Sequence, residues 1–240
     1  MLRPNSAVIA VVLCTGSLAC SKKIPECNAL VKQLNDSSTA IQTATTNLAS
    51  NPQQTKDAFD KFAATTKTET DKLVKVELTI AELQGFSKNY QTILNEITTA
   101  AQAVAKANGD AESVQQAVSK SQTSWTSAMT ELGAACAKAK KECQSLDKAA
   151  KPPNVSGIRP ADDAKKLDEY AKNIASVDLK SPDMKTAVEA MKKSVGEFAD
   201  ALRKAATVQQ DVEKATKSMT EAGNKEPALV KSINDFCQAG

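Results

Sequence analysis

The stretch "VQQAVSKSQTSWTSAMTELGAACAKAKKECQSL", residues 114–146, decides the fold class. Its apolar and small residues recur at steps of three and four. They are Val114, Val118, Ser121, Trp125, Met129, Leu132, Cys136, Ala139, Cys143 and Leu146. Such steps place side chains on one face of an α-helix. The stretch therefore predicts one amphipathic helix with two cysteines on its buried face.

The same spacing recurs along the rest of the chain, with brief interruptions. The interruptions and new helix starts lie at residues 50–52, 79–82, 108–110, 151–160, 181–183 and 223–227. Thr79 and Glu82 have the spacing of a helix capping box. Asn-Gly-Asp at 108–110 predicts a turn between two antiparallel helices. The chain is thus a series of helices with short connections.

Composition supports an all-α fold. Charged residues make up 25 % of the 240 residues and hydrophobic residues 41 %, as in a folded globular protein. Aromatic residues make up only 3 %, which suits narrow contacts between helices better than a β-sandwich. We therefore expect an elongated antiparallel helical bundle.

Charge and residue types also exclude classes of function. The net charge is only +3 and both signs are mixed, so we expect no nucleic-acid partner. The chain has no histidine, which removes the commonest general base and the commonest metal ligand. It has no glycine-rich phosphate loop and no CxxC pair for a zinc site. We expect no enzymatic activity, no cofactor and no metal.

Residues 1–19 have the layout of a secretory signal peptide. Arg3 supplies one positive charge before the apolar run "AVIAVVL" at 7–13, and small residues follow. The run is far shorter than the ~20 residues that a membrane-spanning helix needs. The leader predicts export.

Two interpretations of the cleavage site stay open. The segment "SLAC", residues 17–20, resembles the lipobox of bacterial lipoproteins, whose cysteine is acylated and becomes the mature N-terminus. Ser17 stands where that pattern usually has leucine. An ordinary signal-peptidase site also fits, because Ser17 and Ala19 are both small.

The cysteine count favours the lipobox. Cleavage removes Cys14 and leaves five cysteines, Cys20, Cys27, Cys136, Cys143 and Cys237. Five is an odd number, whereas acylation of Cys20 leaves four that can form two disulfides in an oxidising compartment. We therefore expect a lipid anchor at Cys20 and a tether over residues 20–25. Ser21 is not the aspartate that retains enteric lipoproteins in the inner membrane, so the resemblance implies the outer membrane.

A shift of 101 residues aligns the two halves of the chain. The segment "VEL" at 76–78 falls on "VDL" at 177–179, and Cys136 falls on Cys237. The segment "ECNALVK" at Glu26 also matches "ECQSLDK" at Glu142. These matches indicate an internal duplication.

The duplication predicts two tandem helical modules, residues 26–142 and 143–240, with a linker at 151–160. Each module would contain one disulfide, Cys27–Cys136 in the first and Cys143–Cys237 in the second. The pairing of Cys27 with Cys143 and of Cys136 with Cys237 remains open. A Cys136–Cys143 bond is not expected within one helix, because seven residues rise about 10.5 Å and a disulfide needs Cα atoms within ~7 Å.

The mature chain resembles a known group of proteins. The segments "ECNALVKQLN", "VELTIAELQGFSKNYQ" and "LVKSINDFCQ" are similar to those of uncharacterised small helical lipoproteins of myxobacteria. That resemblance implies a helical architecture and an envelope location, and it brings no established activity.

These observations predict a lipid-anchored helical-bundle protein of the bacterial cell envelope with a structural or interaction role. Its partners would be the membrane, through the acyl chains, and an envelope protein or glycan. One alternative is an envelope binding protein with a ligand or peptide groove between helices. A distant alternative is a hydrolase with an unusual site that lacks histidine.

Overall fold

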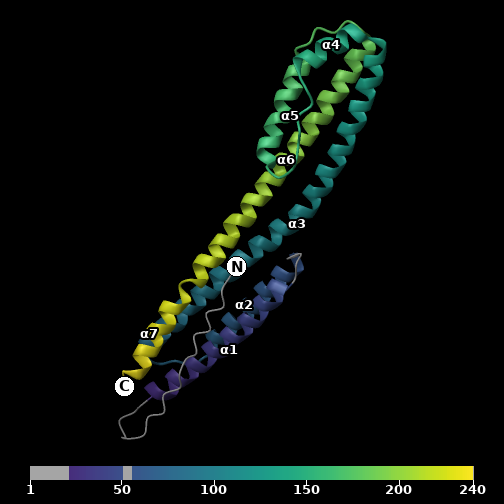
Figure 1. Cartoon of the computed structure of the whole chain (residues 1–240). Coiled ribbons are helices and arrows are strands. Elements are labelled where there is room, and N and C mark those ends of the chain that lie inside the picture. Colours follow the sequence, from purple (N-terminus) through teal and green to yellow (C-terminus); the bar gives the residue numbers. More distant parts are fainter. Residues whose placement is uncertain (1–21, 51–55, 240) are drawn as a thin grey trace. The chain divides into compact units, whose positions relative to one another are not determined.

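The chain is described by a computed structural model over residues 22–50 and 56–239. Its regular elements there are all α-helices, drawn in Figure 1. They are α1 (Lys23–Ser50), α2 (Lys56–Val74), α3 (Ala81–Lys138), α4 (Lys140–Ala149), α5 (Pro160–Ala175), α6 (Pro182–Gly223) and α7 (Glu226–Gln238). The prediction of an all-α, disulfide-linked helical bundle is confirmed.

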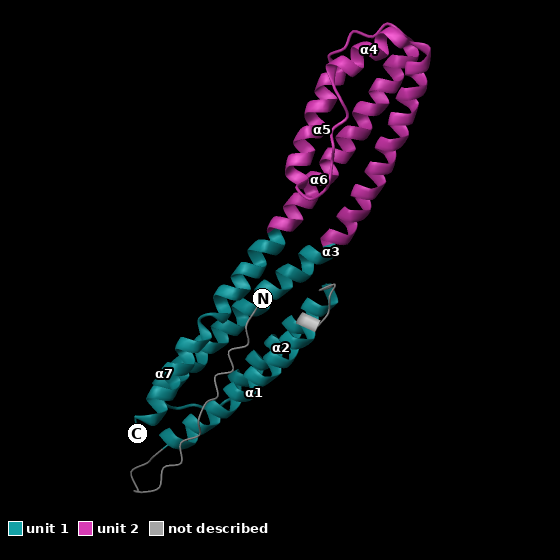
Figure 2. Ribbon diagram, in the orientation of Figure 1, with its two compact units in different colours: residues 1–109, 211–240 teal, residues 110–210 magenta. Residues whose placement is uncertain are grey.

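The chain divides into two compact units, coloured separately in Figure 2. Unit 1 comprises Met1–Gly109 and Asp211–Gly240, and unit 2 comprises Asp110–Gln210. The helices α3 and α6 each continue from one unit into the other. This division differs from the predicted modules 26–142 and 143–240, because each unit combines segments from both halves of the sequence.

Unit 1 buries two groups of side chains between α1, α2, α3 and the C-terminal helices. One group joins α1, α2, α3 and α7 and includes Leu30, Leu73, Tyr90 and Ile233, each almost fully buried. The other includes Phe59 and Phe62 of α2 and Met219 of α6. Full burial of one such side chain contributes about 1.5–3 kcal/mol to the free energy of unfolding. These groups therefore hold α1, α2 and α3 against α6 and α7.

Unit 2 has one continuous core. It is built from the C-terminal part of α3, α4, α5 and the N-terminal part of α6. Leu167, Met184, Met191 and Val195 are completely buried there. Trp125 packs beside Phe198, with ring centroids 5.6 Å apart.

The turn predicted at residues 108–110 does not form. These residues lie inside α3, which is helical from Ala81 to Lys138. Gly109 serves a packing purpose instead, because a Cβ at this position would lie 3.2 Å from Cδ of Lys56. The missing side chain lets the first turn of α2 approach α3 closely.

The predicted linker is present between α4 and α5, and a buried carboxylate organises it. Asp163 accepts hydrogen bonds from the backbone N–H groups of Ser156 (3.0 Å) and Gly157 (2.9 Å). Gly157 has φ +72°, a conformation that favours glycine. Lys166 donates to the same carboxylate at 2.8 Å.

Candidate functional site

The residue predicted to carry the lipid, Cys20, lies outside the described residues. The described chain begins just after it, at the start of α1. The ends of the helices that lie near this point in unit 1 therefore form the candidate site, together with the equivalent helix ends in unit 2.

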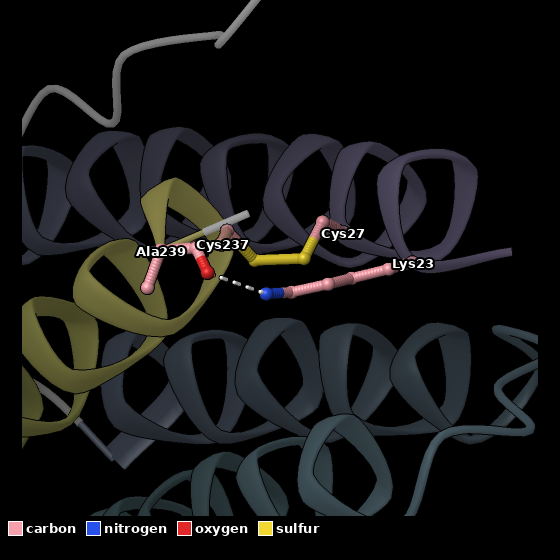
Figure 3. Close-up of a disulfide and its surroundings, with 4 residues drawn as sticks. All are labelled: Lys23, Cys27, Cys237 and Ala239. Carbon is pink, nitrogen blue, oxygen red and sulfur yellow. Dashed lines mark hydrogen bonds between the residues drawn. A yellow bond between two sulfur atoms is a disulfide. The ribbon is translucent and has the colours of Figure 1, made fainter. Parts of the chain in front are cut away.

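A disulfide joins the first turns of α1 to the end of α7. Cys27 and Cys237 are 210 residues apart in sequence, and their Cα atoms lie 5.8 Å apart. Figure 3 shows this bond with Lys23, whose Nζ donates a hydrogen bond of 3.3 Å to the carbonyl oxygen of Ala239. A cation at a helix C-terminus also interacts favourably with the helix dipole. We call Lys23, Cys27, Cys237 and Ala239 the terminal clasp.

Aromatic contacts secure the terminal clasp. The Lys23 ammonium lies 4.5 Å from the ring centroid of Phe236, a cation–π contact. Phe236 in turn meets Phe86 of α3 edge to face, with centroids 5.8 Å apart. The start of α1 is thus fixed to both α7 and α3.

Glu26, next to Cys27, connects α1 to the beginning of α3. Its carboxylate accepts hydrogen bonds from the hydroxyl of Thr79 and from the backbone N–H groups of Thr79 (2.8 Å) and Ile80 (3.0 Å). The Thr79 hydroxyl bond lowers the pKa of Glu26; partial burial opposes this shift, and the two N–H groups reinforce it. Thr79 was expected to form a capping box with Glu82, but its hydroxyl is bonded to Glu26.

The second disulfide joins Cys136 and Cys143, which corrects the expectation that these two residues do not pair. Their Cα atoms lie 5.0 Å apart. The predicted continuous helix over residues 114–146 breaks at Ala139 (φ −124°, ψ 58°), where α3 ends and α4 begins. The break removes the helical rise on which the exclusion of this pair depended.

Both anticipated pairings are therefore wrong, although all four cysteines are in disulfides. Cys27 bonds neither Cys136 nor Cys143, because Cys27 and Cys237 belong to unit 1 while Cys136 and Cys143 belong to unit 2. Two disulfides indicate an oxidising, extracytoplasmic environment.

Glu142, next to Cys143, has a role like that of Glu26. It accepts a hydrogen bond of 3.0 Å from the backbone N–H of Ser181, directly before α6. An ion pair of 3.1 Å between Lys138 and Asp183 joins the end of α3 to the same helix start. The repeated Glu-Cys pair is visible in the sequence, but no local pattern there predicts the role of the two glutamates.

Other buried polar groups of unit 1 have partners within the fold. Glu69, with 2 % of its surface exposed, accepts from Ser37 (3.0 Å) and Lys72 (2.7 Å). The hydroxyls of Thr66 and Thr98 lie 2.7 Å apart. These contacts join helices, and their satisfied hydrogen bonds give them a structural role.

Neither a metal site nor a membrane-spanning helix is found over residues 22–50 and 56–239. No group of three or more cysteine, aspartate or glutamate side chains in these segments could hold a metal ion. No helix in the same segments is both long and apolar enough to cross a bilayer.

Comparison with known proteins adds no relative. The chain matches no protein-family model, no curated protein and no solved structure.

Proposed function

We propose that the protein is a lipid-anchored, non-enzymatic helical protein of the bacterial outer membrane, attached through acylated Cys20. It serves as a structural or interaction module for an envelope protein or glycan. The leader at residues 1–19 and the even number of remaining cysteines support this proposal, as do the two disulfides.

The terminal clasp is the observation that carries the proposal. A tether on Cys20 would enter the folded chain at Lys23, only four residues before Cys27. Helix ends fray readily because their backbone groups lack intrahelical partners. A disulfide from Cys27 to Cys237 prevents a pull on the tether from detaching α1 without also moving α7. Such a clasp is suited to a protein held at a surface by its N-terminus.

The anchor is tested in a Gram-negative host with Cys20→Ser and a matched control, Cys14→Ser. Both variants lose one cysteine near the N-terminus, but only Cys20 is expected in the mature protein. We expect wild type and Cys14→Ser in the outer-membrane fraction, and Cys20→Ser to be absent from that fraction.

Mass spectrometry of the mature N-terminus provides the second readout. We expect a diacylglycerol and an N-acyl group on Cys20 in wild type and in Cys14→Ser. An unmodified Cys20, cleavage at another bond, or outer-membrane localisation of Cys20→Ser would overturn the lipid anchor.

A further inference from the structure

We propose that the chain is two copies of one helical repeat whose C-terminal arms are exchanged, and that the arms are interchangeable between the two repeats and between two copies of the chain. Repeat 1 has a body (residues 26–109) and arm 1 (110–138). Repeat 2 has a body (142–210) and arm 2 (211–238). Unit 1 is then body 1 with arm 2, and unit 2 is body 2 with arm 1. This inference does not depend on the lipid anchor.

From the end of the second helix onward, the helix boundaries of the two bodies agree at a shift of 101 residues. The second helix of each body ends at Val74 (α2) and Ala175 (α5), and the third begins at Ala81 (α3) and Pro182 (α6). The boundary between the units follows Gly109 in one repeat and Gln210 in the other, at the same shift. The structure thus repeats the register that the sequence shows.

Backbone hydrogen bonds repeat in the same register. Before the third helix of each body, the N–H of Val76 donates to the carbonyl of Leu73 (3.2 Å), and Val177 donates to Ile174 (3.4 Å). Such agreement extends to irregular backbone, where helical periodicity alone would not produce it.

The glutamate before the body cysteine has one role in both repeats. Glu26 accepts from the N–H of Ile80 at 3.0 Å, and Glu142 accepts from the N–H of Ser181 at 3.0 Å. Ile80 and Ser181 are the residues directly before α3 and α6. Each glutamate therefore satisfies the start of the third helix of its own body.

The cores match position by position. The pairs of equivalent apolar residues that are each exposed by 1 % or less are Leu73 and Ile174, Leu83 and Met184, Tyr90 and Met191, Leu94 and Val195, and Ala101 and Leu202. The bodies differ in their first helix, since α1 has 28 residues and α4 only 10. Residues 150–159 connect α4 to α5, so this part of repeat 2 is shorter than the corresponding part of repeat 1.

The arms differ in one respect, because arm 1 lies within the continuous helix α3 whereas arm 2 is interrupted between α6 and α7. Each arm nevertheless has a cysteine near its end that is bonded to the other repeat. Cys136 of arm 1 bonds Cys143 of body 2, and Cys237 of arm 2 bonds Cys27 of body 1. In each unit the disulfide joins two equivalent cysteines, one in the body directly after a glutamate and one near the end of the arm. The two disulfides are therefore equivalent, and each joins the body of one repeat to the arm of the other.

Residues 108–110 mark the place where an unexchanged repeat would bend. The sequence Asn-Gly-Asp favours a turn, yet it continues α3 across the boundary between the units. A bend here would return arm 1 to body 1. A helix that continues without a turn sends arm 1 to another body, as in domain swapping.

The exchange within one chain is tested by inserting a protease site at Ala139, between Cys136 and Cys143, with all four cysteines of the disulfides kept, and by cutting the folded protein there. On a denaturing gel we expect the two halves to remain joined without reductant and to separate when a reductant is added. Separation without reductant would mean that each repeat keeps its own arm, and it would overturn the exchange.

Interchangeability is tested with double variants of the mature chain, each also carrying Cys20→Ser. Two body–arm variants each keep the two cysteines of one repeat. Cys143→Ser with Cys237→Ser keeps Cys27 of body 1 and Cys136 of arm 1. Cys27→Ser with Cys136→Ser keeps Cys143 of body 2 and Cys237 of arm 2. Two controls keep two body cysteines (Cys136→Ser with Cys237→Ser) or two arm cysteines (Cys27→Ser with Cys143→Ser).

All four variants are refolded with oxidised glutathione, which accepts two electrons and two protons from each thiol pair and becomes two molecules of glutathione. We expect the body–arm variants to form their disulfide, within one chain at low concentration and between two chains at high concentration. In the controls we expect no disulfide between protein cysteines, so that their thiols stay free or carry glutathione as a mixed disulfide. Body–arm variants that recover wild-type helicity but form no disulfide between protein cysteines, as the controls do, would contradict interchangeable arms.

Discussion

The hydroxyl of Tyr90 donates a hydrogen bond of 2.7 Å to the carboxylate of Glu226, a residue 136 positions later in the chain. The bond joins α3 to the first turn of α7 inside unit 1. Burial raises the pKa of Tyr90 far above its usual value, and the negative charge of Glu226 adds to the shift. The protein thus keeps this phenol neutral where an exposed tyrosine would ionise.

Alkaline titration gives the first prediction, because the pKa values of both tyrosines of the chain are raised. Burial and the charge of Asp147 raise the pKa of Tyr170. We expect little phenolate absorbance from the folded protein near pH 10, and full ionisation of both tyrosines near that pH in denaturant. A phenolate signal that rises near pH 10 in the folded protein would contradict both shifts.

The same shifts make stability fall at high pH. Above about pH 10 the unfolded chain releases phenolic protons that the folded chain retains, so the free energy of unfolding decreases as pH rises. Each protected tyrosine contributes about 1.4 kcal/mol per pH unit to this slope. Tyr90→Phe should remove one such contribution, which chemical denaturation at several pH values measures. If the free energy of unfolding of Tyr90→Phe falls with pH as steeply as that of the wild type, Tyr90 does not contribute to the loss of stability at high pH.

Replacing Asp163 tests the buried carboxylate of the linker. Burial alone would raise the pKa of Asp163, but hydrogen bonds from Lys166, Gly157 and Ser156 lower it. A lowered pKa means that this carboxylate stabilises the fold above pH 4 and ceases to do so as pH falls through the folded value. We expect Asp163→Asn to cost about 1–2 kcal/mol at pH 7 and progressively less in acid.

Asp162→Asn is the matched control for this prediction. Asp162 is exposed in the same first turn of α5, so its replacement should cost only about 0.3–1 kcal/mol through the helix dipole. Equal losses for the two variants at pH 7 would show that the hydrogen bonds of Asp163 add nothing beyond its charge.

The two disulfides should differ in their contribution to stability. Cys27–Cys237 spans 210 residues and Cys136–Cys143 only seven. Because a crosslink restricts the unfolded chain more when its loop is longer, removal should cost about 5 kcal/mol for the first and about 2 kcal/mol for the second. Denaturation of Cys27→Ser with Cys237→Ser, compared with Cys136→Ser with Cys143→Ser, measures the difference. A larger loss for the short loop would contradict the entropic explanation.

Two glycines inside α3, Gly109 and Gly133, provide a fifth prediction. Alanine in a helix is about 1 kcal/mol more favourable than glycine, so Gly133→Ala, whose new Cβ meets nothing within 4 Å, should gain most of that amount. Gly109→Ala should gain less, because Cδ of Lys56 must move away from the new Cβ. Thermal denaturation of the two variants tests the order. A larger gain at Gly109 would show that close contact with Lys56 does not matter.

The sequence predicted the helical segments well because each has its own apolar spacing. Pro182 begins α6 and Pro160 begins α5, in agreement with the preference of proline for the first helical turn. The linker expected at residues 151–160 lies between α4 and α5, and the interruption expected at 223–227 lies between α6 and α7. These features depend on local preferences, which a single sequence carries.

The predictions that proved wrong concern features that depend on packing and crosslinks between segments and not on local sequence preference. Asn-Gly-Asp at 108–110 has the local preference of a turn. In the structure these residues lie inside the continuous helix α3, where Gly109 packs against Lys56 of α2. No proline or glycine marks the break at Ala139, which lies inside the loop closed by Cys136–Cys143. The cysteine pairing follows from which arm meets which body, and no local pattern encodes that choice.

The span of Cys27–Cys237 has a consequence for the order of biosynthesis. Unit 1 needs α7, so its core and its crosslink must wait until the chain has emerged as far as Cys237. Unit 2 is a single contiguous segment, Asp110–Gln210, so its core does not require the residues that follow it. The N-terminal helices, although made first, are completed last, and until then their unburied apolar faces depend on protection from aggregation.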